Sequence, residues 1–97
     1  MLQIQETYIN QTRGHRFGES GWYKPFTDDK GKLFRSLQRE YGKCTSRVYQ
    51  DTPDGKPDAI GWVFEKRMRY EDARGKHPER DFYTREVWVT IRQVKGE

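Results

Sequence analysis

The sequence has little of what marks secreted or membrane proteins. Cys44 is the only cysteine among 97 residues, so no intramolecular disulfide can form, and this favours a reducing compartment. No apolar run is long enough to cross a membrane, and the N-terminus MLQIQETYIN lacks the basic and apolar regions of a secretory signal. We therefore expect a soluble protein that acts in the cytoplasm.

Aliphatic residues are also scarce. Leu, Ile, Val and Phe together make up under a fifth of the residues, and such a low content can indicate disorder. However, 14% of the residues are aromatic and the net charge is only +4. Because each large ring buries about 150–250 Å², a few rings can replace many aliphatic side chains. We expect one folded domain over residues 1–97 with an aromatic-rich core.

The chain contains no block of like charge. Its isoelectric point is about 9.3, but basic and acidic residues are both distributed along the whole length. A mild positive field is compatible with weak attraction to nucleic acid. It is more typical of an ordinary soluble surface, because nucleic-acid-binding tails concentrate their charge.

Hydrophobic periodicity predicts one helix and several strands. Positions 33, 34, 37 and 41 share one helical face, Thr27 or Asp28 can cap the helix, and Gly42 stops it. Elsewhere apolar residues alternate with polar ones, as in strands. The predicted order is strand 2–9, a long loop 12–27, helix 27–43, strand 44–51, turn 52–56, strand 59–70, a polar loop 71–80 and strand 81–91.

One helix can cover only one face of the resulting sheet. We therefore expect an α+β fold with an antiparallel sheet of three or four strands in β-α-β-β-β order. The helix packs on the face that carries Trp62, Phe64, Val87 and Val89. Trp88 then points to the other side, because successive residues of a strand alternate between faces.

The uncovered face combines arginine with aromatic rings. Period-two geometry places Arg67, Arg69, Phe82 and Trp88 there, and we expect Arg47 and Tyr49 from the preceding strand to join them. This mixture is enriched in protein-binding hot spots and also stacks nucleobases. Three other interpretations stay open: cross-strand pairs that stabilise a solvated sheet without a ligand, a 14–26 loop that folds over this face and buries Trp88, and a dimer formed through this face.

The stretch GHRFGESGWYKPF, residues 14–26, has three glycines near basic side chains. A phosphate-binding loop must lie directly between a strand and a helix, since the amides at the helix start hold the phosphate. Here residues 22–26 separate the last glycine from the helix, and no GK[ST] sequence follows. The stretch is better explained as a loop anchored by its rings, or as a recognition loop that presents Trp22 and Tyr23.

The sequence contains no convincing catalytic or metal-binding pattern. Its histidines and its cysteine lack the paired spacing of metal ligands. Asp28 and Asp29 are more typical of a helix cap than of a divalent-ion site. A phosphate-handling enzyme would have to use His15, Arg16 and Asp28, which nothing in the sequence brings together. We expect no catalytic residue, no metal and no cofactor.

Three segments together resemble a known group of proteins. GWYKPFTDDKGKLFRSLQREYGKC, IGWVFEKRMRYEDAR and REVWVTI are similar to small uncharacterised accessory proteins of actinobacterial bacteriophages and prophages. The likeness covers about Arg16 to Ile91 and brings no catalytic motif. It implies a short accessory protein that acts in the cytoplasm of an infected bacterium by binding a host or phage macromolecule.

These observations favour a non-enzymatic protein-interaction module that binds a host or phage protein, with a homodimer as a further possibility. Its binding residues are expected on the uncovered sheet face and in the 14–26 loop, namely Trp22, Tyr23, Tyr49, Arg67, Arg69 and Trp88. The alternative is a small nucleic-acid-binding domain that contacts phosphates through the basic stripe Lys32, Arg35, Arg39 and Lys43.

Overall fold

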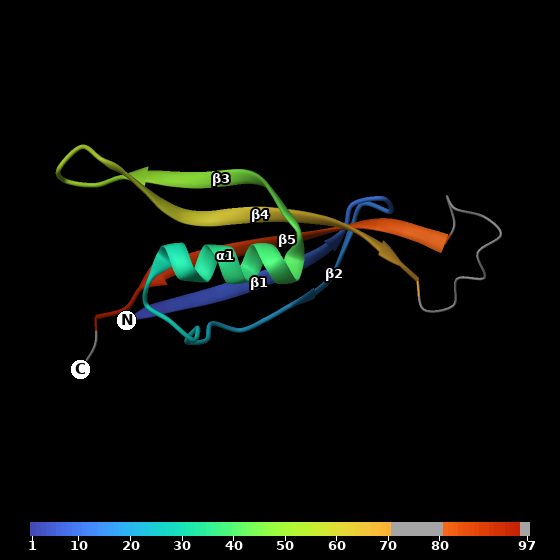
Figure 1. The fold of residues 1–97 in the computed structure, drawn as a ribbon, viewed down its shortest axis with the longest axis horizontal. Helices are drawn as coiled ribbons and strands as arrows, with labels where there is room; N and C mark the ends of the chain where they lie inside the picture. Colours follow the sequence, from blue (N-terminus) through green and yellow to red (C-terminus); the bar gives the residue numbers. More distant parts are fainter. Residues whose placement is uncertain (71–80, 96–97) are drawn as a thin grey trace.

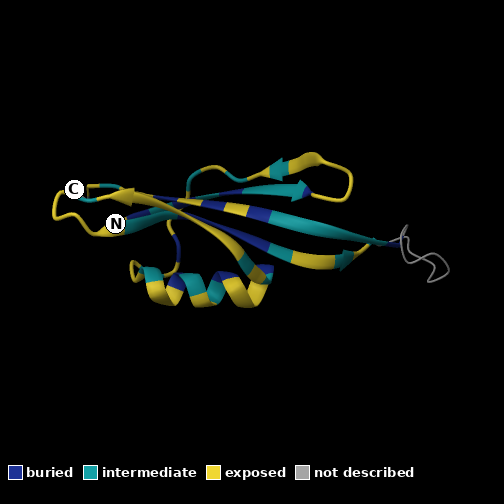
Figure 2. Cartoon of the chain, turned by 90° about the horizontal axis from the view of Figure 1, so that it is seen from above, coloured by how far each residue is buried: buried dark blue, intermediate teal, exposed yellow. Residues whose placement is uncertain are grey.

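In the part of the chain that the structure describes, five antiparallel strands form one sheet and one helix lies across one of its faces (Figures 1 and 2). This computed structural model describes residues 1–70 and 81–95, so the polar loop expected at 71–80 lies outside the described residues. The strand order is β2-β1-β5-β4-β3. The elements are β1 Leu2–Asn10, β2 His15–Glu19, α1 Lys30–Tyr41, β3 Lys43–Asp51, β4 Pro57–Arg69 and β5 Phe82–Gln93. The expected α+β class is confirmed, with five strands instead of three or four.

The helix begins slightly later than the sequence suggested. Its N-cap is Asp29, whose carboxylate accepts hydrogen bonds from the amides of Gly31 at 2.9 Å and Lys32 at 3.2 Å. Asp28 has a different role, since its Oδ1 accepts the amide of Leu2 at 2.8 Å. The two aspartates therefore fix the helix start and the start of β1 separately.

The end of the helix depends on Gly42, which has φ of 105°. A Cβ at this position would lie 2.3 Å from the main-chain oxygen of Glu65. We expect Gly42→Ala to lower the free energy of unfolding by about 2 kcal/mol, because both the backbone angle and the close approach become unfavourable. Urea denaturation measures this loss. Gly55→Ala is the matched control, because Gly55 has φ of 79° but nothing within 4 Å of its Cβ position. Equal losses in the two variants would contradict the steric argument.

The core lies between α1 and the sheet. The four side chains expected under the helix are confirmed there, and each is at most 4% exposed: Trp62, Phe64, Val87 and Val89. Leu33, Leu37 and Tyr41 face them from the helix. The ring of Phe34 lies 5.3 Å from that of Trp62, between ring centroids. An aromatic-rich core thus compensates for the few aliphatic residues.

The long loop predicted at residues 12–27 is wrong in its first half. β2 lies within it and pairs with β1 as a hairpin, whose turn includes Gly14 at φ of 68°. Beyond β2 the chain continues along β1, and Ile4 and Tyr23 exchange main-chain hydrogen bonds of 2.9 and 3.0 Å. The sequence did not reveal β2 because this edge strand is mostly exposed and has no apolar alternation.

The placement of Arg47 and Tyr49 on the uncovered face is also wrong. The pairing of β3 with β4 shifts between Cys44 and Ser46, so β3 has one extra residue there. The β3 side chains after this bulge therefore point to the opposite sheet face from the one that simple alternation predicts. Arg47 is therefore opposite Trp62, and its guanidinium lies 4.7 Å from the ring centroid of Phe34. Tyr49 lies on the same side, where its hydroxyl raises the pKa of Arg47.

Candidate functional site

The open face, by which we mean the sheet face opposite α1, has an exposed indole near its middle. Trp88 is paired with Thr7 on β1 and with Val63 on β4. Its side chain is 45% exposed, whereas Trp62, on the neighbouring strand, is 4% exposed under the helix. The two tryptophans therefore point to opposite faces, as alternation requires.

Two arginine–aromatic pairs lie on the open face on either side of Trp88. The guanidinium of Arg67 is 4.9 Å from the ring centroid of Phe82, and that of Arg92 is 4.0 Å from that of Trp22. Arg92 also donates two hydrogen bonds, of 2.9 and 2.7 Å, to Gln3 Oε1. Both cations are held in place by neighbouring side chains before any ligand arrives.

The structure brings together only some of the residues expected to bind protein. Four of the six expected residues belong to the open face: Trp22, Arg67, Arg69 and Trp88. Tyr23 does not, because the next residue along an extended chain points the other way, and its hydroxyl donates to Glu6 on the helix side.

That contact belongs to a buried polar cluster that the sequence analysis missed. Glu6 is 2% exposed, and three tyrosine hydroxyls donate to its carboxylate. Tyr8 and Tyr41 both donate to Oε2, the latter at 2.6 Å, and Tyr23 donates to Oε1. The available signal was Glu6 itself, which interrupts the inward-facing series Leu2, Ile4 and Tyr8 of β1 and must find partners when buried.

The cluster holds three segments of the chain together. Burial and the hydrogen bonds to Glu6 raise the pKa values of Tyr8, Tyr23 and Tyr41 above the ordinary value of 10.0, so these phenols stay protonated further into the alkaline range. Both carboxylate oxygens of Glu6 accept hydrogen bonds from these hydroxyls. The cluster connects β1, the segment after β2, and the last turn of α1.

The basic stripe is not one continuous surface. Lys32, Arg35 and Arg39 are exposed on α1. Lys43 begins β3 and is paired with Glu65, which places it on the open face. Three of the four expected phosphate contacts therefore share a surface, and the fourth lies across the sheet from them.

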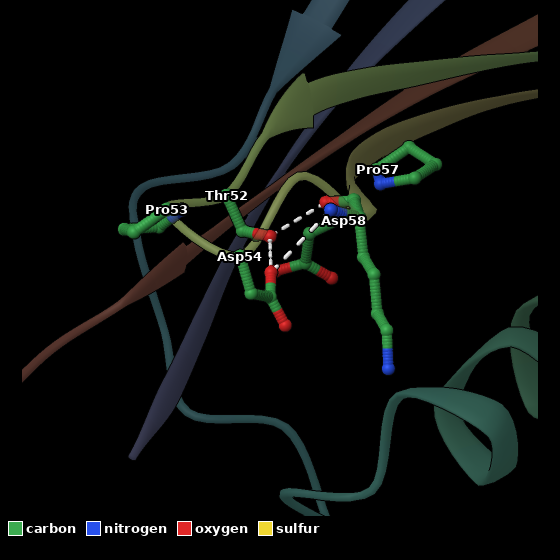
Figure 3. Close-up of a pocket in the computed structure, with 6 residues that line it drawn as sticks. Thr52, Pro53, Asp54, Pro57 and Asp58 are labelled. Carbon is green, nitrogen blue, oxygen red and sulfur yellow. Dashed lines mark hydrogen bonds between the residues drawn. The ribbon is translucent and has the colours of Figure 1, made fainter.

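The hairpin between β3 and β4 borders an open recess of about 480 Å³ (Figure 3). Its polar groups bond mainly to one another: the Thr52 hydroxyl lies within hydrogen-bond distance of the Asp54 carboxylate, to which it can donate, and 2.6 Å from the Lys56 carbonyl. The contact with Thr52 lowers the pKa of Asp54. These bonds stabilise the turn itself.

The alternative phosphate-handling arrangement is not formed. His15 pairs with Asn10 at one end of β1, whereas Asp28 bonds to Leu2 at the other end. The nine-residue length of β1 separates these ends by about 27 Å. Within residues 1–70 and 81–95, no three His, Cys, Asp or Glu side chains are grouped closely enough to hold a metal ion.

Comparisons with known proteins identify no relative of this chain. No family model matches the chain, and neither a characterised protein nor a solved structure shows significant similarity to it. In the part of the chain that the structure describes, no helix has the length and apolar character needed to span a bilayer.

Proposed function

We propose that this protein is a non-enzymatic interaction module that binds another protein through its open face. The observation that carries the proposal is the 45% exposed indole of Trp88, located between the Arg67–Phe82 and Arg92–Trp22 pairs. Tryptophan and arginine are the residues most enriched in binding hot spots. A merely solvated sheet face does not need an indole at this position.

The geometry also favours binding by limiting its entropic cost. Long arginine side chains lose rotamer freedom when they are fixed at an interface, by about 0.5–1.5 kcal/mol each. Arg92 is already fixed by Trp22 and Gln3, and Arg67 by Phe82. The best partner surface places an apolar side chain over Trp88 and carboxylates beside these two arginines.

The proposal also includes the cellular location and the kind of partner that the resemblance to phage accessory proteins implies. The partner is then a host or phage protein in the bacterial cytoplasm, where the single Cys44 stays reduced. A second copy of the chain is the alternative partner of the same face, and sedimentation velocity over a range of concentrations distinguishes this case.

Selection of peptides from a random display library tests the proposed surface. Enriched peptides are synthesised, and their affinities for the protein are measured by calorimetry. We expect Trp88→Ala to weaken binding by about 2 kcal/mol, roughly thirtyfold, because a central indole is lost. Lys32→Ala, on the outer side of α1, should leave the affinity unchanged. Peptides that bind Trp88→Ala as tightly as the original protein would refute the open face as the binding surface.

Nucleic-acid binding remains the second candidate because of one observation. Lys32, Arg35 and Arg39 are exposed on α1, and none forms an ion pair with the described residues. Phosphate contacts through this stripe predict that affinity for a labelled oligothymidine falls steeply between low and moderate salt. Such a salt dependence, lost when the three residues are replaced by alanine, would favour this function over the first.

A further inference from the structure

The sheet splits at one end, between β4 and β5. Their pairing runs from Arg69↔Phe82 to Gly61↔Thr90 and stops there, although both strands continue. Figure 1 shows the β3–β4 hairpin turning away from β1 and β5 at this end. The space between is a cleft of about 400 Å³, whose lining includes Leu2, Lys30, Ile60, Ile91 and Gln93.

The β5 wall of the cleft presents unpaired main chain. Met1 and Val94 exchange main-chain hydrogen bonds of 3.2 and 2.8 Å across β1 and β5. Consecutive residues of an antiparallel strand turn their N–H and C=O groups to opposite neighbours. Ile91 and Gln93 therefore turn theirs toward β4. Gln93 lies beyond the last paired residue, Thr90, and its main chain forms no hydrogen bond with the described residues.

The β4 wall offers fewer main-chain groups for pairing. Thr52 donates its amide to the Lys56 carbonyl at 3.2 Å, and the same alternation then turns Pro57 and Ala59 toward the cleft. Pro57 has no N–H to donate. The Ala59 carbonyl accepts a 3.3 Å hydrogen bond from Lys30 Nζ, which also pairs with Asp58 at 2.6 Å. The free edge of the cleft is therefore that of β5.

We propose that this β5 edge, Ile91–Gln93, binds an extended peptide segment of another chain by strand addition. The segment pairs its main chain with the N–H and C=O groups of Gln93 and places an apolar side chain against Leu2 and Ile60. An uncharged segment suits the cleft, because Lys30 and Asp58 neutralise each other and Arg92 is held at Trp22. This inference concerns a site separate from Trp88 and does not depend on the proposed function.

The test uses an acetylated and amidated octapeptide of alternating valine and threonine between two terminal lysines. Binding is measured by fluorescence anisotropy and by amide hydrogen exchange of the full chain. Gln93→Pro removes the amide that faces the cleft without removing a bond to β1, whereas Gln93→Ala keeps this amide. We expect Gln93→Pro to weaken peptide binding about tenfold, the equivalent of one lost hydrogen bond, and Gln93→Ala to leave it unchanged.

Hydrogen exchange decides where the peptide binds. Protection of the Gln93 amide on peptide addition, together with unchanged protection of the β4–β5 core in Gln93→Pro, supports the site. Protection confined to the exposed edge strand β3, equal binding by both variants, or no binding of the peptide would overturn it. Trp88→Ala should leave this binding intact, so failure of the open face and failure of the cleft are separate results.

Discussion

Glu6→Leu should lower the free energy of unfolding by about 3–4 kcal/mol. The substitution removes the acceptor of three tyrosine hydroxyls, and a buried donor left without a partner costs about 1–3 kcal/mol. Tyr41 is 8% exposed and cannot turn to water, whereas Tyr23 is 41% exposed and can. We therefore expect most of the loss to come from Tyr41 and Tyr8.

A mutant cycle separates the hydrogen bonds from the packing. If unsatisfied hydroxyls cause the loss, Glu6→Leu should cost much less in a Tyr8→Phe/Tyr41→Phe background, because apolar pairs of similar shape are nearly neutral. Urea denaturation of the four proteins measures the coupling. Glu40→Gln, at an exposed position on the last turn of α1, should change stability by less than about 0.5 kcal/mol. The same cost for Glu6→Leu in both backgrounds would show that the hydroxyls are not responsible.

Alkaline pH should unfold the protein through the same cluster. The pKa values of Tyr8, Tyr23 and Tyr41 are raised from 10.0 in the folded chain by burial and by Glu6. The unfolded chain therefore releases these protons first, so their stabilisation is complete below pH 10 and is lost as the pH rises above it. Each phenol held protonated costs about 1.4 kcal/mol for every pH unit above 10. Tyr23 contributes less than the other two, because it is partly exposed.

Tyrosinate absorbance and circular dichroism, followed together from pH 9 upward, test this expectation. Absorbance from Tyr8 and Tyr41, obtained by difference from the Tyr8→Phe/Tyr41→Phe variant, should appear only as the fold is lost. The variant retains every lysine, so it controls for the loss of their charge in the same pH range. Smooth ionisation of these two phenols in a protein that remains folded would contradict the role assigned to the cluster.

Local periodicity accounts for the successes of the sequence analysis. The apolar face of α1 and the strands around Trp62 and Val87 have strong patterns, because one side of each is buried in the core. β2 was missed because an exposed edge strand needs no apolar alternation. The faces of Arg47 and Tyr49 were reversed by one extra residue in β3, and a bulge leaves no mark in hydrophobic periodicity.

The sequence by itself determined the α+β class, the helix with its buried stripe, and the opposite orientations of Trp62 and Trp88. These depend on side-chain alternation within single elements. Only the tertiary structure decided which tyrosines donate to Glu6, which aromatic ring each arginine packs against, and where the pairing of β4 with β5 ends. Such features depend on pairing register and on contacts between residues far apart in the chain, such as Tyr41 and Glu6. No local pattern encodes them.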